Sequence, residues 1–147
     1  MKLAALAWSL VVLLACAATA AEDTRIGTIK TLKGDARIIA GGSSVAATVG
    51  GAVHQNDTLE TGLDGAIGLT FIDNTTLSMG PKSRITLTKV VFNPDQGDFA
   101  FATNIVKGTF MFASGSIARL APQAVQITTP VNTIGIRGTR FLVKIDG

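Results

Sequence analysis

The sequence predicts an all-β fold: a single domain of about ten short strands, arranged as a β-roll, a short solenoid or a sandwich, after an N-terminal signal segment. Thr, Ile and Val occur 18, 13 and 11 times, whereas Glu occurs only twice. β-Branched residues fit pleated, half-buried surfaces, and Glu favours helices. After the signal segment, apolar and polar residues alternate between turns rich in Gly, Asn, Asp and Pro, and no long stretch shows the helical period of about 3.6 residues. The pattern excludes a helical bundle.

Residues 1–21 have the layout of a secretory signal peptide. A short positive start, Met1-Lys2, precedes the apolar run Leu3–Leu14, and small residues with A-x-A cleavage patterns follow it. We therefore expect cleavage after Ala20 or Ala21.

Two alternatives for this segment remain open. Residues 13–16 resemble a bacterial lipobox, in which Cys16 would be acylated. Residues 3–21 carry no charge and approach the length of a membrane-spanning helix, so the segment could also be retained as an anchor. All three readings put the rest of the chain outside the cytoplasmic membrane.

The domain that follows, residues 22–147, divides into strands at its turns. The segment Ile26–Ile39 is expected to form two strands around Gly34-Asp35, and Ala66–Phe71 is the clearest strand because every second residue is large and apolar. Further strands are expected within residues 45–49, 53–61, 77–79, 85–88, 99–103, 107–112, 116–120, 125–128 and 139–145. Their apolar faces predict a core of Val, Ile, Leu and Phe.

Charge and composition exclude several classes of function. Lys and Arg number 13 against 10 Asp and Glu, a formal net charge of +3, and the basic residues form no runs, so a nucleic-acid partner is not expected. One Cys excludes an internal disulfide and a cysteine-built zinc site. After the signal segment phenylalanines are the only aromatic residues, which argues against a stacking platform for sugars or bases.

The sequence offers no catalytic or metal-binding constellation, and no cofactor is expected. His54 is the only histidine, and we expect it to be an exposed turn residue. Asp57, Glu60, Asp64 and Asp73 do not follow the spacing of a calcium loop. Asp57 is expected to accept hydrogen bonds from turn amides, with a cation site as the alternative.

Two stretches of the domain carry motifs. The first is Val53–Gly62, followed by Gly65–Leu69 and Asp73–Leu77, and the second is Thr129–Phe141, which reads TPVNTIGIRGTRF. The first stretch resembles the order G-D-x-L-x-T-G, strand, D-G-S-x-L, and the second resembles T-P-x-x-x-x-G-V-R-G-T-x-F. Both patterns are motifs of the FecR family of exported bacterial regulatory domains. The most specific part of the resemblance covers residues 53–145, and the strands of residues 26–49 look like the leading strands of the family.

Asn56 and Asn74 depart from the family pattern, which has Gly at both positions. Asn tolerates left-handed backbone better than most residues, so the turns are expected to survive.

The resemblance implies an interaction domain without enzymatic activity. The motif residues with a candidate role in interaction are Asp57, Thr61, Thr129, Pro130, Gly135, Arg137, Gly138, Thr139 and Phe141. The Arg137 guanidinium suits two roles, capping carbonyls in a tight bend or binding a partner or anion. Gly135 and Gly138 are expected where positive φ or close backbone approach is required. Pro130 is expected to end a strand.

By resemblance we expect a periplasmic module that relays or scaffolds signals through contact with an envelope protein, as family members do for some iron–siderophore receptors. Only two residues precede the apolar run, so an anti-sigma arm and direct sigma-factor control are not expected. Membrane contact is expected only if Cys16 is lipidated or the signal segment is retained. A structural or adhesive envelope module, associated with carbohydrate, is the alternative.

The sequence ends on Asp146-Gly147, a dipeptide that opens hairpin turns, so we expect either a truncated chain or a minimal domain. The last strand would then present an open edge to a partner or to another copy of the chain.

Overall fold

A computed structural model describes residues 24–135 and 139–146 as one curled, mainly antiparallel sheet. The strands are β1 Arg25–Lys33, β2 Ala36–Ala40, β3 Ser43–Ala46, β4 Ala52–His54, β5 Thr58–Thr61, β6 Ala66–Phe71, β7 Thr76–Met79, β8 Arg84–Asn93, β9 Asp98–Ala113, β10 Val125–Thr128, β11 Thr133–Ile134 and β12 Arg140–Ile145. The helical elements are α1 Ser116–Leu120 and the 3-10 turns η1 Pro94–Gln96 and η2 Pro122–Ala124. The all-β prediction is confirmed.

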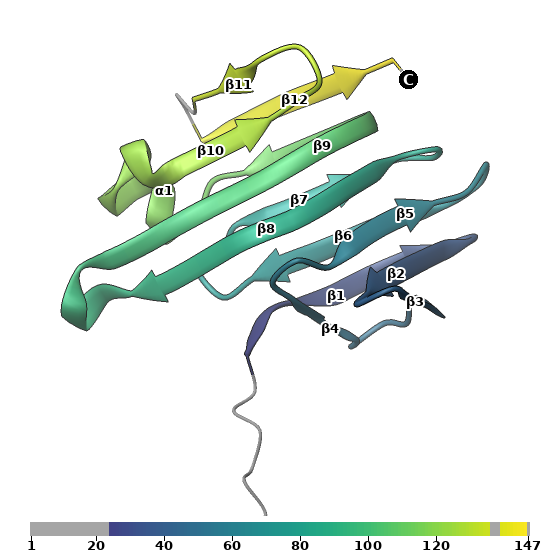
Figure 1. The fold of residues 1–147 in the computed structure, drawn as a ribbon, viewed down its shortest axis with the longest axis horizontal. Coiled ribbons are helices and arrows are strands. Elements are labelled where there is room, and N and C mark those ends of the chain that lie inside the picture. The colour runs from purple at the N-terminus through teal and green to yellow at the C-terminus, as the bar shows by residue number, and fades with distance from the viewer. Residues whose placement is uncertain (1–23, 136–138, 147) are drawn as a thin grey trace, which may run out of the picture.

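The long strand β9 joins the two halves of the sheet, and Figure 1 shows β6 and β7 in a layer behind β5 and β8. The first part of β9 pairs with β8 and, in parallel, with β10. Its last part pairs with β7 and β12. From β9 the order runs through β8, β5 and β2 to β3 in one direction, and through β7, β6 and β1 to β4 in the other. Among the described residues β12 pairs with β9 alone, so it lies at a margin of the sheet.

A glycine and a hydroxyl network form the corner of β9. Gly108 has φ +108°, and an added Cβ would overlap Ser83. The Ser83 hydroxyl oxygen accepts the Thr109 N–H at 3.1 Å, and the Ser83 N–H donates to Thr61 Oγ1 at 2.9 Å. The Thr61 hydroxyl in turn donates to the Gly80 carbonyl at 2.7 Å. The network therefore fixes β5, the turn between β7 and β8, and the bend in β9 against one another.

Apolar side chains from both halves of the sheet fill the space between them. Phe71 meets Phe101 edge to face with ring centroids 5.0 Å apart, and Phe101 meets Phe112 in the same way at 6.5 Å. Phe141 of β12 stacks on Phe112 at 4.9 Å. Phe71, Phe101 and Phe112 are fully buried, so the edge strand β12 is attached to the core through an aromatic contact.

The strand expected within residues 116–120 was wrong, because these residues form α1. The Ser116 N–H donates to the Asp73 carbonyl at 2.8 Å, and the Ile117 N–H donates to the Asp73 carboxylate at 3.2 Å. These bonds satisfy two amides that begin the helix, where no partner exists within the helix itself. Of the five residues only Ile117 is buried.

The described residues form twelve strands, in keeping with the expectation of about ten. Two further details differ from the expectations. The strands expected at 99–103 and 107–112 are one continuous strand, because Asn104 and Ile105 between them pair with Thr86 and Ile85 of β8. The strand expected at 45–49 lies at Ser43–Ala46, since the preceding turn needs only Gly41 and Gly42, both at positive φ.

A single buried hydroxyl gives a stability prediction. Thr103 is buried in β9, and its hydroxyl has no hydrogen-bond partner among the described residues. Thr103→Val keeps the shape of the side chain and removes a desolvated polar group. We expect the free energy of unfolding, measured in urea, to rise by about 1 kcal/mol. The control is Thr86→Val, which removes a hydroxyl paired with Thr58 at 3.0 Å and should give no gain. A loss of stability in Thr103→Val would contradict the conclusion that the buried Thr103 hydroxyl lacks a hydrogen-bond partner.

Candidate interaction surface

The first motif closes the turn between β4 and β5. The Asp57 carboxylate accepts the His54 N–H at 2.8 Å, and the Asp57 N–H donates to the His54 carbonyl at 3.2 Å. Asn56, between them, has φ +67°, the left-handed conformation expected of it. Asp57 and Thr61 are both buried, so these two candidate residues hold the fold together and present no side chain to a partner.

The T-P part of the second motif forms the turn between β10 and β11. The Thr129 N–H donates to the Asn132 carbonyl at 2.8 Å, and its hydroxyl oxygen accepts the Asn132 N–H at 3.2 Å. Pro130 follows the end of β10, as the sequence predicts, and is exposed. Val131, at the tip of this turn, is 81% exposed.

The remaining motif residues lead into the edge strand. Gly135 has neither positive φ nor a close neighbour, so the expectation made for it was wrong; it lies exposed after β11, where an added Cβ would meet open space. The carbonyl of Thr139 accepts the Ser114 N–H at 2.7 Å, directly before β12. Arg137 and Gly138 lie outside the described residues, and their expected roles stay predictions.

The register of β12 determines which of its backbone groups point away from the sheet. Thr139 bonds to Ser114, and the alternation of an antiparallel ladder then turns the N–H and C=O groups of Phe141, Val143 and Ile145 toward β9. The backbone groups of Arg140, Leu142 and Lys144 face outward. Among the described residues no strand pairs with this outer edge.

The side chains on this strand alternate in the same way. Phe141, Val143 and Ile145 are buried or partly buried, whereas Arg140, Leu142 and Lys144 are exposed. Leu142 is 62% exposed and lies opposite Met111 of β9, which is 45% exposed. The strand therefore presents an apolar centre between two cations.

A basic hollow lies at the C-terminal end of β12. Its volume is about 310 Å³, and its charged lining consists of Lys82, Lys107, Lys144 and Asp146. Three ammonium groups outnumber one carboxylate here, so the hollow favours an anionic group. This hollow was not predictable from the sequence, because the three lysines come from three separate elements.

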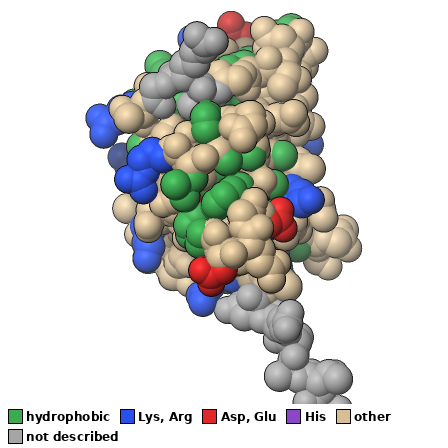
Figure 2. All heavy atoms as spheres, turned by 90° about the vertical axis from the view of Figure 1, so that its left-hand side faces the viewer, with side chains coloured by type: hydrophobic (Ala, Val, Ile, Leu, Met, Phe, Trp, Pro, Cys, Tyr) green, Lys and Arg blue, Asp and Glu red, His purple; other side chains and the backbone are tan. Residues whose placement is uncertain are grey.

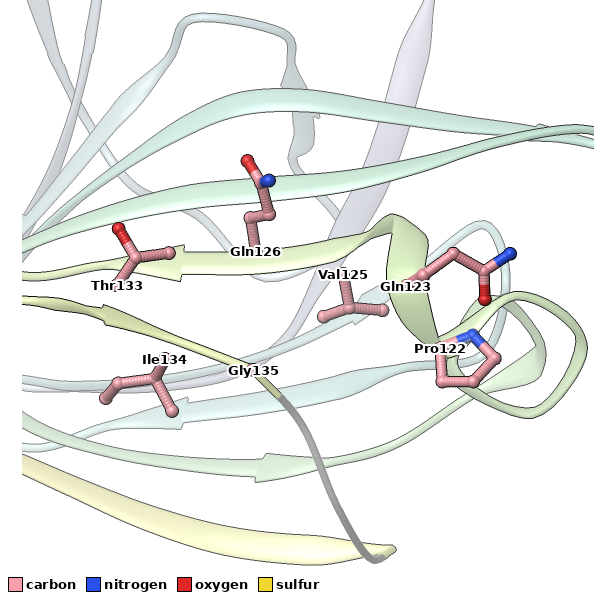
Figure 3. A pocket seen from close by; sticks show the side chains of 7 residues that line it. All are labelled: Pro122, Gln123, Val125, Gln126, Thr133, Ile134 and Gly135. Carbon is pink, nitrogen blue, oxygen red and sulfur yellow. The ribbon is translucent and has the colours of Figure 1, made fainter.

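A second, uncharged hollow of about 790 Å³ lies beside β10 and β11 (Figure 3). Val125 and Ile134 supply apolar surface, and Gln123, Gln126 and Thr133 supply neutral polar groups. Such a lining can hydrogen-bond a neutral polar ligand, and these side chains include no acid, base or strong nucleophile.

The end of the molecule that carries α1 and η1 is a third exposed region. Figure 2 shows hydrophobic side chains gathered there, with Lys and Arg at the margin. Leu120 of α1 is 59% exposed. This end is a further surface on which a partner could be detected.

Within residues 24–135 and 139–146, no cluster of three or more His, Cys, Asp or Glu side chains is placed to hold a metal ion. In the same part of the chain, no helix combines the length and apolar character needed to cross a bilayer.

Comparison with known proteins agrees with both motifs. The family model described as FecR protein matches residues 57–147. The chain belongs to the FecR family. Neither the curated proteins nor the solved structures gave a match. The FecR match begins at Asp57, near the start of the first motif, and runs through the second. Strands β1 to β4 precede it, and their resemblance to the leading strands of FecR domains stays a prediction.

Proposed function

We propose that this chain is an exported, non-enzymatic FecR-type module that acts by docking to another protein of the bacterial envelope, in the periplasm. The family match over residues 57–147 is the observation that carries the proposal, since FecR proteins are regulatory. The signal-like residues 1–21 support export. The exposed edge strand β12 supports docking, because among the described residues it pairs with β9 alone and Leu142 at its centre is 62% exposed.

In vivo photo-crosslinking tests the proposal. A photo-crosslinking amino acid replaces, one at a time, Leu142 on β12, Leu120 on α1 and Val45 on β3, all of them exposed by more than half. We expect at least one position to give a discrete protein adduct in the periplasmic or envelope fraction. The same amino acid at the buried Leu77 is the control, and it should give no intermolecular adduct.

The alternative is an adhesive module that binds carbohydrate, which the neutral, amide-bearing hollow beside β10 and β11 favours. Retention of the protein on envelope polysaccharide, lost in Gln126→Ala, together with no protein adduct at any of the three positions, would replace the signalling proposal by this one.

A further inference from the structure

The outer edge of β12 has the backbone geometry that binds an extended peptide. Every second residue of β12 faces outward, and these residues are Arg140, Leu142 and Lys144. A further strand can hydrogen-bond to their N–H and C=O groups. The edge is also firmly placed, because Phe141 stacks on Phe112 and Val143 is buried.

The charge on this edge determines what the added strand must carry. Arg140 and Lys144 flank the exposed Leu142 on one face, and the hollow with Lys82 and Lys107 extends the positive region beyond Lys144. Opposite charges directly across two strands stabilise their pairing. The complementary strand therefore has an apolar residue opposite Leu142 and acidic residues on either side of it.

The same charges disfavour a second copy of the chain at this edge. If two β12 strands paired antiparallel about Leu142, each Arg140 would face a Lys144. If they paired parallel and in register, each cation would face its own copy. Like charges directly opposite one another destabilise a strand pair, so both full-length pairings are opposed.

We propose that the outer edge of β12 binds an extended acidic segment of the partner protein by strand addition, with Leu142 as the apolar anchor and with Arg140 and Lys144 as the specificity-determining residues. The inference rests on the proposed function and names the chemistry of the partner.

A pair of synthetic peptides tests the charge requirement. The acidic probe is Ac-Ser-Glu-Val-Val-Val-Glu-Ser-NH2, and the control replaces both Glu residues by Lys. We expect the exported, purified protein to bind the acidic probe about tenfold more tightly than the basic one in an NMR titration. The preference should shrink as salt is added, because screening weakens exposed charge pairs.

Two double variants show whether the preference belongs to this edge. Arg140→Glu with Lys144→Glu should reverse the preference, so that the basic peptide binds more tightly than the acidic one. Arg37→Glu with Lys89→Glu makes the same change in net charge on exposed positions of β2 and β8 and should leave the order unchanged. Equal binding of both peptides to the unmodified protein, or equal effects of the two double variants, would overturn the inference.

Two proline variants test the backbone contact. Leu142→Pro removes an N–H that faces outward, so we expect the protein to stay folded and the acidic probe to be lost. Val143→Pro removes an N–H that bonds to β9 and should instead lower the unfolding midpoint. Unchanged peptide binding by a folded Leu142→Pro would contradict binding of an acidic strand at this edge. The same holds if the unmodified protein forms a homodimer and Leu142→Pro makes it dissociate.

The crosslinking positions separate the two proposals. A protein adduct from Val45 or Leu120 but not from Leu142 keeps the docking function and overturns the assignment to β12. Absence of an adduct from all three positions overturns the docking function itself.

Discussion

Gly108→Ala is expected to lower the free energy of unfolding by about 4 kcal/mol, a large part of the stability of a small domain. The backbone at Gly108 has φ +108°, which a residue with a side chain adopts only under strain. The new Cβ would also overlap Ser83, which is fully buried and bonded to both Thr109 and Thr61. Urea unfolding followed by far-UV circular dichroism measures the loss.

Gly97→Ala is the matched control for the corner of β9. Gly97 also has positive φ, +65°, but an added Cβ would meet nothing within 4 Å. We expect the free energy of unfolding to fall by about 1 kcal/mol, which is the cost of placing a residue with a side chain at positive φ. Equal losses at the two glycines would contradict the claim that packing against Ser83 fixes the bend.

Asp73→Ala is expected to cost about 3 kcal/mol and to release α1. The Asp73 carboxylate is fully buried and accepts the Thr75 N–H at 3.0 Å, the Thr75 hydroxyl at 2.8 Å and the Ile117 N–H at 3.2 Å. Removing it leaves these donors without their acceptor, and hydrogen bonds to charged groups are among the strongest in proteins. Urea unfolding gives the free energy, and faster tryptic cleavage after the exposed Arg119 reports the opening of α1.

Asp64→Ala is the control for the carboxylate. Asp64 is exposed, and its carboxylate lies 3.4 Å from the Asp35 amide, a long contact. We expect its loss to change stability by no more than about 0.5 kcal/mol. Protection of the Arg119 site in Asp73→Ala equal to that in Asp64→Ala would show that α1 does not depend on Asp73.

Strand positions were predictable wherever apolar and polar residues alternate along the sequence. β6 at Ala66–Phe71 and β10 at Val125–Thr128 have the bounds that the pattern predicts. α1 was not predictable from its five residues, because Ser116–Leu120 covers less than two turns of the helical period of about 3.6 residues. Its conformation depends on Asp73, which lies 44 positions away from Ile117 in the sequence. A pattern of neighbouring residues cannot reveal a hydrogen bond between residues so far apart in the sequence.

The candidate interaction surface was predictable only in part. Alternation and the motif ending at Phe141 located β12, and an open edge on the last strand was expected. The direction of its backbone groups required the register with β9, which the bond between Thr139 and Ser114 fixes. The basic hollow could be recognised only from the fold. Its lysines come from the turn after β7, the corner of β9 and the end of β12, namely Lys82, Lys107 and Lys144.

Amide hydrogen exchange of β12 in the free protein tests the central claim most directly. If β12 forms an unpaired edge, the amides of Arg140, Leu142 and Lys144 should exchange fast and those of Phe141, Val143 and Ile145 slowly, in strict alternation. Adding the acidic peptide should slow the three fast amides. Slow exchange at all six positions without the peptide would show that the edge is already occupied, and would contradict the claim.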